Sequence, residues 1–129
     1  MRAIDTNIVV RALAADDPVQ TRQASVILDG GDIFIPVTVL LESEWVLRNA
    51  YEMSPATIVA ALRRLAGLDG ILLEDPVRVD QALDWTEQGM DFADALHLAR
   101  ADDCSEFLSF DRKLAKIASK VTAFRVTLP

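Results

Sequence analysis

The chain has few of the residues that build disulfide frameworks and zinc sites. Its 129 residues include one cysteine, Cys104, and one histidine, His97. A single cysteine excludes an internal disulfide framework, and no spacing of cysteine and histidine resembles a zinc site. Because a chain without disulfides suits a reducing compartment, we expect a cytoplasmic protein in which Cys104 has no chemical role.

Long hydrophobic runs and a secretory signal are also missing. No apolar stretch approaches the roughly 20 residues that a bilayer-spanning helix needs. The N-terminus has one arginine and then the carboxylate of Asp5, so it lacks the charged region and apolar stretch of a signal peptide. We therefore expect a soluble protein without a membrane partner.

Aromatic side chains and positive charge are scarce. Aromatic residues make up 6% of the chain, whereas hydrophobic residues make up 51%. Ala, Leu, Val and Ile dominate, and this composition suits helices packed on a buried parallel sheet. The net charge of -7 argues against a protein that holds nucleic acid mainly by its overall field. A local basic surface beside an acidic site is still compatible with this composition.

Turn and capping residues divide the chain into alternating strands and helices. We expect strands at residues 2–5, 33–37, 70–75, 106–110 and 123–128. We expect helices from about residue 8 and at residues 18–29, 38–51, 54–68, 75–89, 91–103 and 111–120, with Thr38 and Ser54 as caps. This alternation predicts an α/β fold with a mostly parallel sheet covered by helices on both faces. Without a linker or an internal repeat, residues 1–129 are expected to form a single domain.

Four carboxylates occupy strand ends or first helical turns, which collect at one edge of such a sheet. Asp5 ends the first strand, and Asp111 follows the strand sequence "FLSF". Glu42 lies one turn into the helix after the second strand, and Asp94 lies in the first turn of "DFADALHLA". Glu42 and Asp94 interrupt segments whose neighbours should be buried, and no nearby Lys or Arg neutralises them. Because buried carboxylates are costly unless paired or bound to metal, we expect a cation there.

Oxygen ligands without a histidine or cysteine cluster select a hard ion such as Mg²⁺ or Mn²⁺ rather than zinc. Hard ions held by a few carboxylates usually keep waters and meet phosphate oxygens. The pattern therefore predicts phosphodiester hydrolysis by metal-activated water. For Asp5 alone, capping of the following helix is an equally good interpretation.

The segments "AIDTNIVV", "VLLESEWVLR", "DFADALHLA" and "LSFDRKLAK" occur in that order and together span nearly the whole chain. In this order they resemble the PIN-domain family and most closely its VapC-type toxins. The resemblance implies a PIN-like three-layer sandwich and a metal-dependent endoribonuclease that acts on RNA. It also implies a homodimer that is neutralised by a cognate VapB-type antitoxin. By position it assigns the catalytic, metal-binding acids and the residues supporting the first of them: Asp5, Glu42, Asp94 and Asp111, supported by Thr6 and Asn7.

Other polar residues near these motifs have two interpretations. Thr6 and Asn7 can hold a ligand carboxylate or cap a helix. Glu44 rivals Glu42, but it lies about 200° around the helix, so we expect it to face solvent. Asp91 precedes Asp94 on the same helical face, and an N-terminal cap is its favoured role. His97 is a candidate proton shuttle, although packing is the commoner role of a lone histidine.

Several basic residues follow the last acidic motif. Arg112, Lys113 and Lys116 are candidates for contact with RNA phosphates, as are Lys120 and the more distant Arg48. A solvated helix face is an equally good interpretation of this stripe. The two tryptophans have helical spacing with apolar residues and are expected in the core or an interface: Trp45 and Trp85.

Three other functions are compatible with parts of the pattern. An RNA-processing PIN nuclease outside a toxin-antitoxin pair would have the same acids. A phosphoacceptor signalling domain is also small, acidic and Mg²⁺-binding, but it needs an aspartate on a central strand, and "IFIPV" has none. A catalytically silent binding module would not need the intact acidic set.

Overall fold

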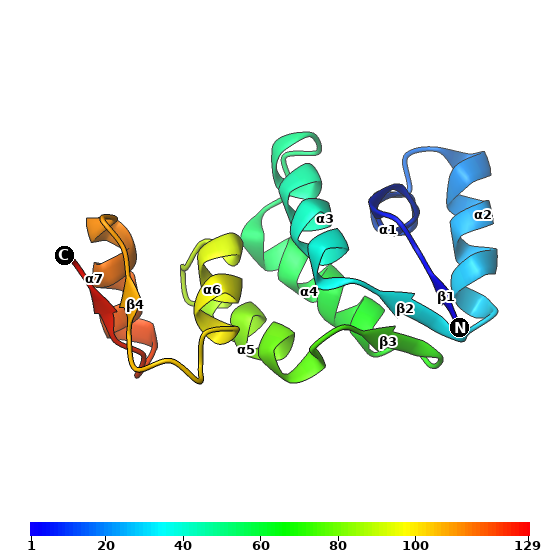
Figure 1. The fold of residues 1–129 in the computed structure, drawn as a ribbon. Coiled ribbons are helices and arrows are strands. Elements are labelled where there is room, and N and C mark those ends of the chain that lie inside the picture. Colours follow the sequence, from blue (N-terminus) through cyan, green and yellow to red (C-terminus); the bar gives the residue numbers. More distant parts are fainter. The chain divides into compact units, whose positions relative to one another are not determined.

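The computed structural model describes all residues, Met1–Pro129. The chain divides into two compact units, Met1–Pro76 and Val77–Pro129. The fold is α/β, with strands and helices alternating along both units (Figure 1). No helix is both long and apolar enough to cross a membrane.

The first unit contains a three-stranded parallel sheet in the order β1-β2-β3. Its strands are β1 (Arg2–Ala3), β2 (Ile33–Ile35) and β3 (Ile71–Leu73). Figure 1 shows the connecting helices, which are α1 (Thr6–Ala14), α2 (Pro18–Asp29), α3 (Val37–Asn49) and α4 (Pro55–Ala66). Helix α1 packs against both α2 and α3, so the start of α1 lies beside α3.

The central strand β2 anchors the core of the first unit. Ile33 and Ile35 have no solvent-exposed surface, and Val9 of α1 and Leu47 of α3 are equally buried. The segments that lead into β2 and β3 approach each other closely at Gly31 and Gly70. A Cβ atom added to Gly70 would lie 2.7 Å from the Cα atom of Gly31. Both glycines also have positive φ angles, so other residues would strain this approach.

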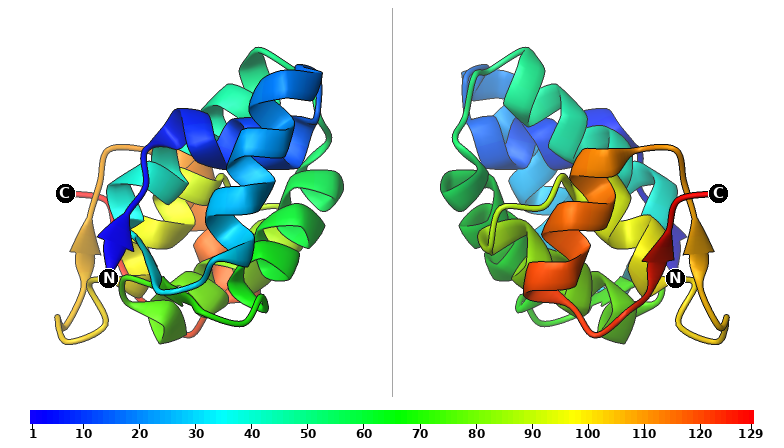
Figure 2. Two further views of the ribbon diagram at one scale, coloured as in Figure 1. Left: turned by 90° about the vertical axis from the view of Figure 1, so that its right-hand side faces the viewer. Right: turned by 90° about the vertical axis from the view of Figure 1, so that its left-hand side faces the viewer.

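The second unit contains a two-stranded parallel sheet of β4 (Phe107–Leu108) and β5 (Val126–Thr127). Figure 2 shows these strands as neighbouring arrows. The helices are α5 (Pro76–Glu87), which starts at the boundary, α6 (Phe92–Ala99) and α7 (Arg112–Val121). Phe92 and Leu98 of α6 are fully or almost fully buried and contribute to this unit's core. The predicted α/β class and the parallel strand pairing are confirmed.

Acidic and hydroxyl side chains cap most of the helices, and the caps considered in the sequence at Asp5, Ser54 and Asp91 are confirmed. Asp5 and Asp91 accept hydrogen bonds from backbone N–H groups at the starts of α1 and α6. Ser54 and Asp111 do the same for α4 and α7. Each cap satisfies a backbone donor that has no partner within the helix.

Helix α3 departs from the predicted cap at Thr38. The helix begins at Val37, after Pro36, and no side chain of its own first turn caps it. Instead, the Oε1 atom of Glu74 accepts a hydrogen bond of 2.8 Å from the backbone nitrogen of Val37. The prediction for Thr38 is wrong because a residue distant in sequence supplies the acceptor.

The orientation of α3 also corrects two predictions. Its buried stripe comprises Leu40, Ser43, Glu44 and Leu47, which follow helical spacing. Glu44 is 5% exposed, so the prediction that it faces solvent is wrong. Trp45 is 58% exposed, so of its two predicted places the core is excluded and an interface stays a prediction. The sequence pattern was misleading because two polar residues lie on the buried stripe and an aromatic residue lies outside it.

Candidate functional site

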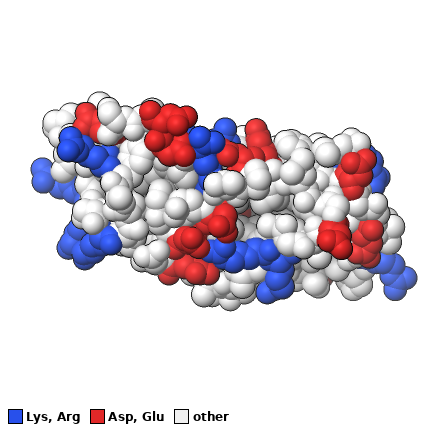
Figure 3. All heavy atoms as spheres, turned by 90° about the horizontal axis from the view of Figure 1, so that it is seen from below, with Lys and Arg blue, Asp and Glu red and all other residues white.

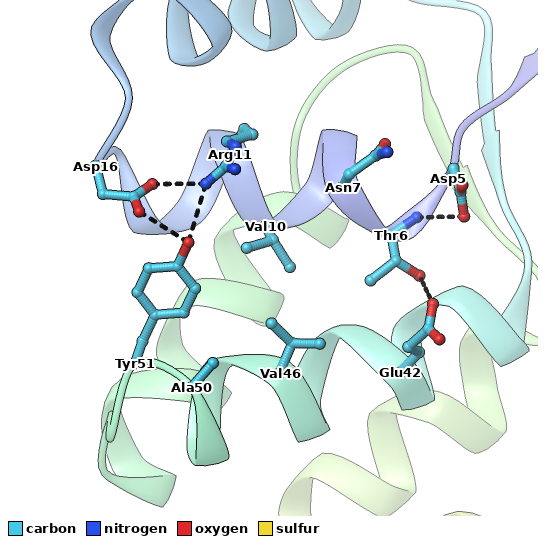
Figure 4. A pocket seen from close by; sticks show the side chains of 10 residues that line it. All are labelled: Asp5, Thr6, Asn7, Val10, Arg11, Asp16, Glu42, Val46, Ala50 and Tyr51. Carbon is cyan, nitrogen blue, oxygen red and sulfur yellow. Dashed lines mark hydrogen bonds and ion pairs between the residues drawn. The ribbon is translucent and has the colours of Figure 1, made fainter.

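In the first unit, two carboxylates accept hydrogen bonds from the same buried residue, Thr6. The Oδ1 atom of Asp5 accepts a hydrogen bond of 2.8 Å from the backbone nitrogen of Thr6. The Thr6 hydroxyl donates to the Oε1 atom of Glu42, across from α1 to α3 (Figure 4). Thr6 is buried, whereas Asp5 and Glu42 are exposed. Thr6 therefore holds Glu42 beside Asp5 and leaves both carboxylates accessible.

These side chains line one end of a pocket of about 650 Å³. Its lining residues come from α1, α3 and the residues that directly adjoin these helices: Asp5, Thr6, Asn7, Val10, Arg11, Asp16, Glu42, Val46, Ala50 and Tyr51. A volume of this size is typical of pockets that bind small molecules or parts of larger ligands. The predicted supporting residue Asn7 lies in the same pocket as the two carboxylates.

The other end of the pocket holds a polar network. Arg11 Nη1 donates to Asp16 Oδ1 at 3.1 Å and to the Tyr51 hydroxyl at 3.0 Å. The Tyr51 hydroxyl donates to Asp16 Oδ2 at 2.8 Å. This last hydrogen bond lowers the pKa of Asp16 and raises the pKa of Tyr51. Asp16 is therefore an ionised acceptor at neutral pH.

The second unit contains the other two predicted acids. Asp91 Oδ1 accepts from the backbone nitrogen of Asp94 at 3.1 Å, and Asp111 Oδ1 accepts from that of Leu114 at 3.0 Å. The half-buried carboxylate of Asp94 has no hydrogen-bond or ion-pair partner in the protein. Burial raises the pKa of Asp94, and the negative charges of Asp91 and Asp111 raise it further. Asp94 is thus a carboxylate that a nearby cation would stabilise.

The candidate ligand atoms have the chemistry that a hard divalent ion needs. All are carboxylate, hydroxyl or amide oxygens, which Mg²⁺ and Mn²⁺ prefer. The first unit contributes Asp5 and Glu42, and the second contributes Asp94 and Asp111. Within neither unit do three or more acidic, histidine or cysteine side chains gather closely enough to hold an ion. A complete ion site from both pairs stays a prediction.

Other predicted candidates have more ordinary surroundings. The predicted cap at Asp91 is confirmed, and His97 is exposed on α6. Arg48 forms an ion pair of 2.8 Å with the buried Glu44. The candidates on α7 are all exposed to solvent: Arg112, Lys113, Lys116 and Lys120. On the face shown in Figure 3, basic and acidic side chains are interspersed.

No sequence motif predicted the polar network of Arg11, Asp16 and Tyr51. Arg11 and Tyr51 are 40 positions apart, and no motif links them. The two residues come together because α1 packs against α3. No local sequence pattern indicates that packing. Only a tertiary contact could have identified this end of the pocket.

The chain belongs to the PIN-domain family. The family model, described as PIN domain, matches residues 3–120. This membership supports a nuclease, and the matched range includes the segments of all four acidic motifs. No curated protein sequence matches the chain.

A solved structure also resembles the chain. It is that of VapC20 from Mycobacterium tuberculosis, which is described as a toxin that cleaves the sarcin-ricin loop. The two share 16% sequence identity, with 96% of each chain covered and a TM-score of 0.43.

Proposed function

We propose that the protein is an endoribonuclease that depends on a divalent metal ion, Mg²⁺ or Mn²⁺. The observation that carries this proposal is the environment of Asp94. Its half-buried carboxylate has no protein partner, and its pKa is raised first by burial and then by two further carboxylates, Asp91 and Asp111. A divalent cation would relieve the repulsion between these carboxylates. Membership in the PIN-domain family supports nuclease chemistry as the function of such a cation.

The proposed ligands are the four acids of the sequence motifs. Asp5, Glu42, Asp94 and Asp111 would hold the ion, and Thr6 would keep Glu42 in place through its hydroxyl. When bound, the ion activates water and stabilises the leaving oxygen of the phosphodiester. The backbone N–H groups that bond to Asp5 and Asp111 fix the orientation of these two carboxylates.

We further propose that the nuclease is the toxin of a type II toxin-antitoxin pair. The ordered motifs resemble those of VapC-type toxins, and this resemblance supports a VapB-type antitoxin as partner. It also supports a homodimer and action on cytoplasmic RNA. The basic candidates on α7 would contact phosphates of the strand: Arg112, Lys113 and Lys116.

The nuclease proposal is tested by incubating the purified protein with single-stranded and structured RNA. We expect cleavage with Mg²⁺ or Mn²⁺, complete loss in EDTA and recovery when excess metal is restored. Cleavage that continues in EDTA, from a preparation free of contaminating nuclease, would contradict the proposal.

The toxin proposal needs a separate test in cells. We expect expression of the wild-type protein to slow bacterial growth, and expression of Asp94→Asn to be harmless. Co-expression of a small DNA-binding protein encoded directly upstream should restore growth. Cleavage in vitro without any effect on growth would instead favour an RNA-processing nuclease.

A further inference from the structure

The pocket of the first unit has two chemically different ends. Asp5 and Glu42 lie at one end, and Arg11 and Asp16 lie at the other (Figure 4). The apolar side chains of α1 and α3 lie between them, including Val10 and Val46, as Figure 4 shows. A ligand that fills this pocket would meet carboxylates, then an apolar surface, then a mixed pair of donor and acceptor groups.

The guanidinium of Arg11 is fixed but not fully used. Its Nε atom donates to Gln20 Oε1 at 2.6 Å, and its Nη1 atom donates to Asp16 and Tyr51. Its Nη2 atom has no partner in the protein. The side chain is 32% exposed, so this nitrogen can donate to a ligand in the pocket.

Asp16 supplies acceptors beside this donor. Each of its carboxylate oxygens accepts one hydrogen bond, from Arg11 or from Tyr51. A carboxylate has about four acceptor positions, so about two stay available. The side chain is 44% exposed, and its lowered pKa keeps it ionised. A donor and a bidentate acceptor are therefore presented side by side.

The charges of the pocket select against a phosphate at this end. The lining includes Asp5, Asp16 and Glu42 but only one cationic side chain, Arg11. Since Arg11 is already paired with Asp16, the remaining charges of the lining, those of Asp5 and Glu42, repel a further anion. A neutral planar group with both donors and acceptors on its edge fits better.

Among the RNA bases, guanine presents this edge. Its O6 atom accepts, and its adjacent N1–H and N2–H groups donate, so it matches Arg11 Nη2 and the Asp16 carboxylate. Adenine, cytosine and uracil each lack two neighbouring N–H donors beside an acceptor. The apolar lining at Val10 and Val46 would cover part of the ring.

The spacing also suits an RNA strand along α1. Arg11 lies six residues after Asp5, which is about 9 Å at a rise of about 1.5 Å per residue. Stacked nucleotides advance by about 3.4 Å each, so this span corresponds to two or three nucleotides. We propose that Arg11 and Asp16 form a subsite that reads a guanine within about three nucleotides of the scissile phosphate. This inference rests on the proposed ribonuclease function.

The test is to cleave a random-sequence single-stranded RNA pool in Mn²⁺ and sequence the new ends. The wild type should show guanine enriched at one position within about three nucleotides of the cut. Asp16→Asn should reduce that preference about tenfold, because an amide cannot accept two N–H groups in the same way. The matched control Asp29→Asn removes the same charge from an exposed α2 position and should keep the wild-type pattern.

A second pair of variants covers the case in which Asp16→Asn fails to fold, as judged by circular dichroism. Arg11→Lys keeps the charge but replaces three donor nitrogens by one, so the donor at Nη2 is lost. Arg22→Lys is its exposed control on α2. Only Arg11→Lys should weaken the guanine preference. An unchanged pattern in the folded Arg11 or Asp16 variant, or a wild type without that preference, overturns the subsite alone. A wild type that cleaves no RNA overturns the ribonuclease proposal and the subsite together.

Discussion

The two units treat their acidic side chains in opposite ways. In the first unit, Asp5 and Glu42 are exposed, and both accept hydrogen bonds from Thr6. In the second unit, the half-buried Asp94 has no partner and is flanked by Asp91 and Asp111. The first pair is held by donors of the protein, whereas in the second unit Asp91 and Asp111 accept such hydrogen bonds and the carboxylate of Asp94 between them does not.

This difference distinguishes the positioning of a carboxylate from its need for a cation. Donated hydrogen bonds fix where a carboxylate lies and stabilise its ionised form. Crowded carboxylates instead destabilise the ionised form until a cation arrives. We therefore expect the first unit to position ligands and the second unit to determine how strongly the cation is needed.

The largest expected effect is on RNA cleavage. Asp94→Asn should lower the cleavage rate at least about 100-fold, because it removes a proposed ligand and part of the charge that attracts the ion. Rates of wild type and variant, measured in Mn²⁺ on the same RNA, check this. The control Asp103→Asn changes an exposed acid of the same unit and should cleave normally. Full activity in Asp94→Asn would place the chemistry elsewhere.

A second prediction concerns the two acids of α3. Glu44→Gln should reduce the free energy of unfolding by about 1–2 kcal/mol, because the buried carboxylate loses its charge pairing with Arg48. Glu42→Gln changes an exposed side chain, so the free energy of unfolding of this variant should stay within about 0.5 kcal/mol of the wild-type value. Urea unfolding in EDTA measures both. If the two variants were equally destabilised, the contrast between the buried and exposed acids would be lost.

Removal of the Thr6 hydroxyl should have a smaller effect. Thr6→Val keeps the side-chain shape but leaves Glu42 without its donor, so cleavage should slow about fivefold. Thr6→Ser retains a hydroxyl and should recover most of the activity. The Mn²⁺ concentration that gives half-maximal cleavage should rise for Thr6→Val only. Identical metal dependence in all three proteins would reduce Thr6 to a packing role.

The smallest expected effect is on thermal stability without metal. Because the pKa of Asp94 is raised in the folded state, its favourable contribution is complete below the unfolded pKa of about 3.9. That contribution is lost as the pH rises through the folded pKa. Asp94→Asn avoids this loss and should melt about 1–3 °C above wild type in EDTA at neutral pH.

Melting curves between about pH 3.5 and 7 should show the gap widening as the pH rises. Added Mn²⁺ should raise the melting temperature of the wild type more than that of Asp94→Asn. A variant that melts lower in EDTA and responds equally to Mn²⁺ would show that Asp94 has a structural role instead.

Much of the local structure was predictable because it depends on neighbouring residues. The caps at Asp5, Ser54 and Asp91 involve backbone groups within three residues, so short motifs identify them. The parallel pairing follows from alternating strands and helices. The acidic motifs likewise indicated the PIN-domain family, which the family model matches.

The errors arose where distant segments decide the environment of a side chain. Glu74 caps α3 from 37 positions away, so Thr38 is not needed as a cap. The packing of α3 buries Glu44 and exposes Trp45, against the expectation from polarity. The hydrophobic pattern alone does not fix how a helix is rotated about its axis. A shift of the buried face by one or two residues changes which side chain is buried.

The sequence by itself determined the α/β class, most of the helix starts and the order of the acidic motifs, because these depend on local capping and on periodicity. The tertiary structure alone decided that Thr6 joins Asp5 to Glu42 and that Arg11, Asp16 and Tyr51 close the far end of the same pocket. Those contacts require α1 to pack against α3, and their free energy comes from groups far apart in the chain. No local pattern of residues carries that information.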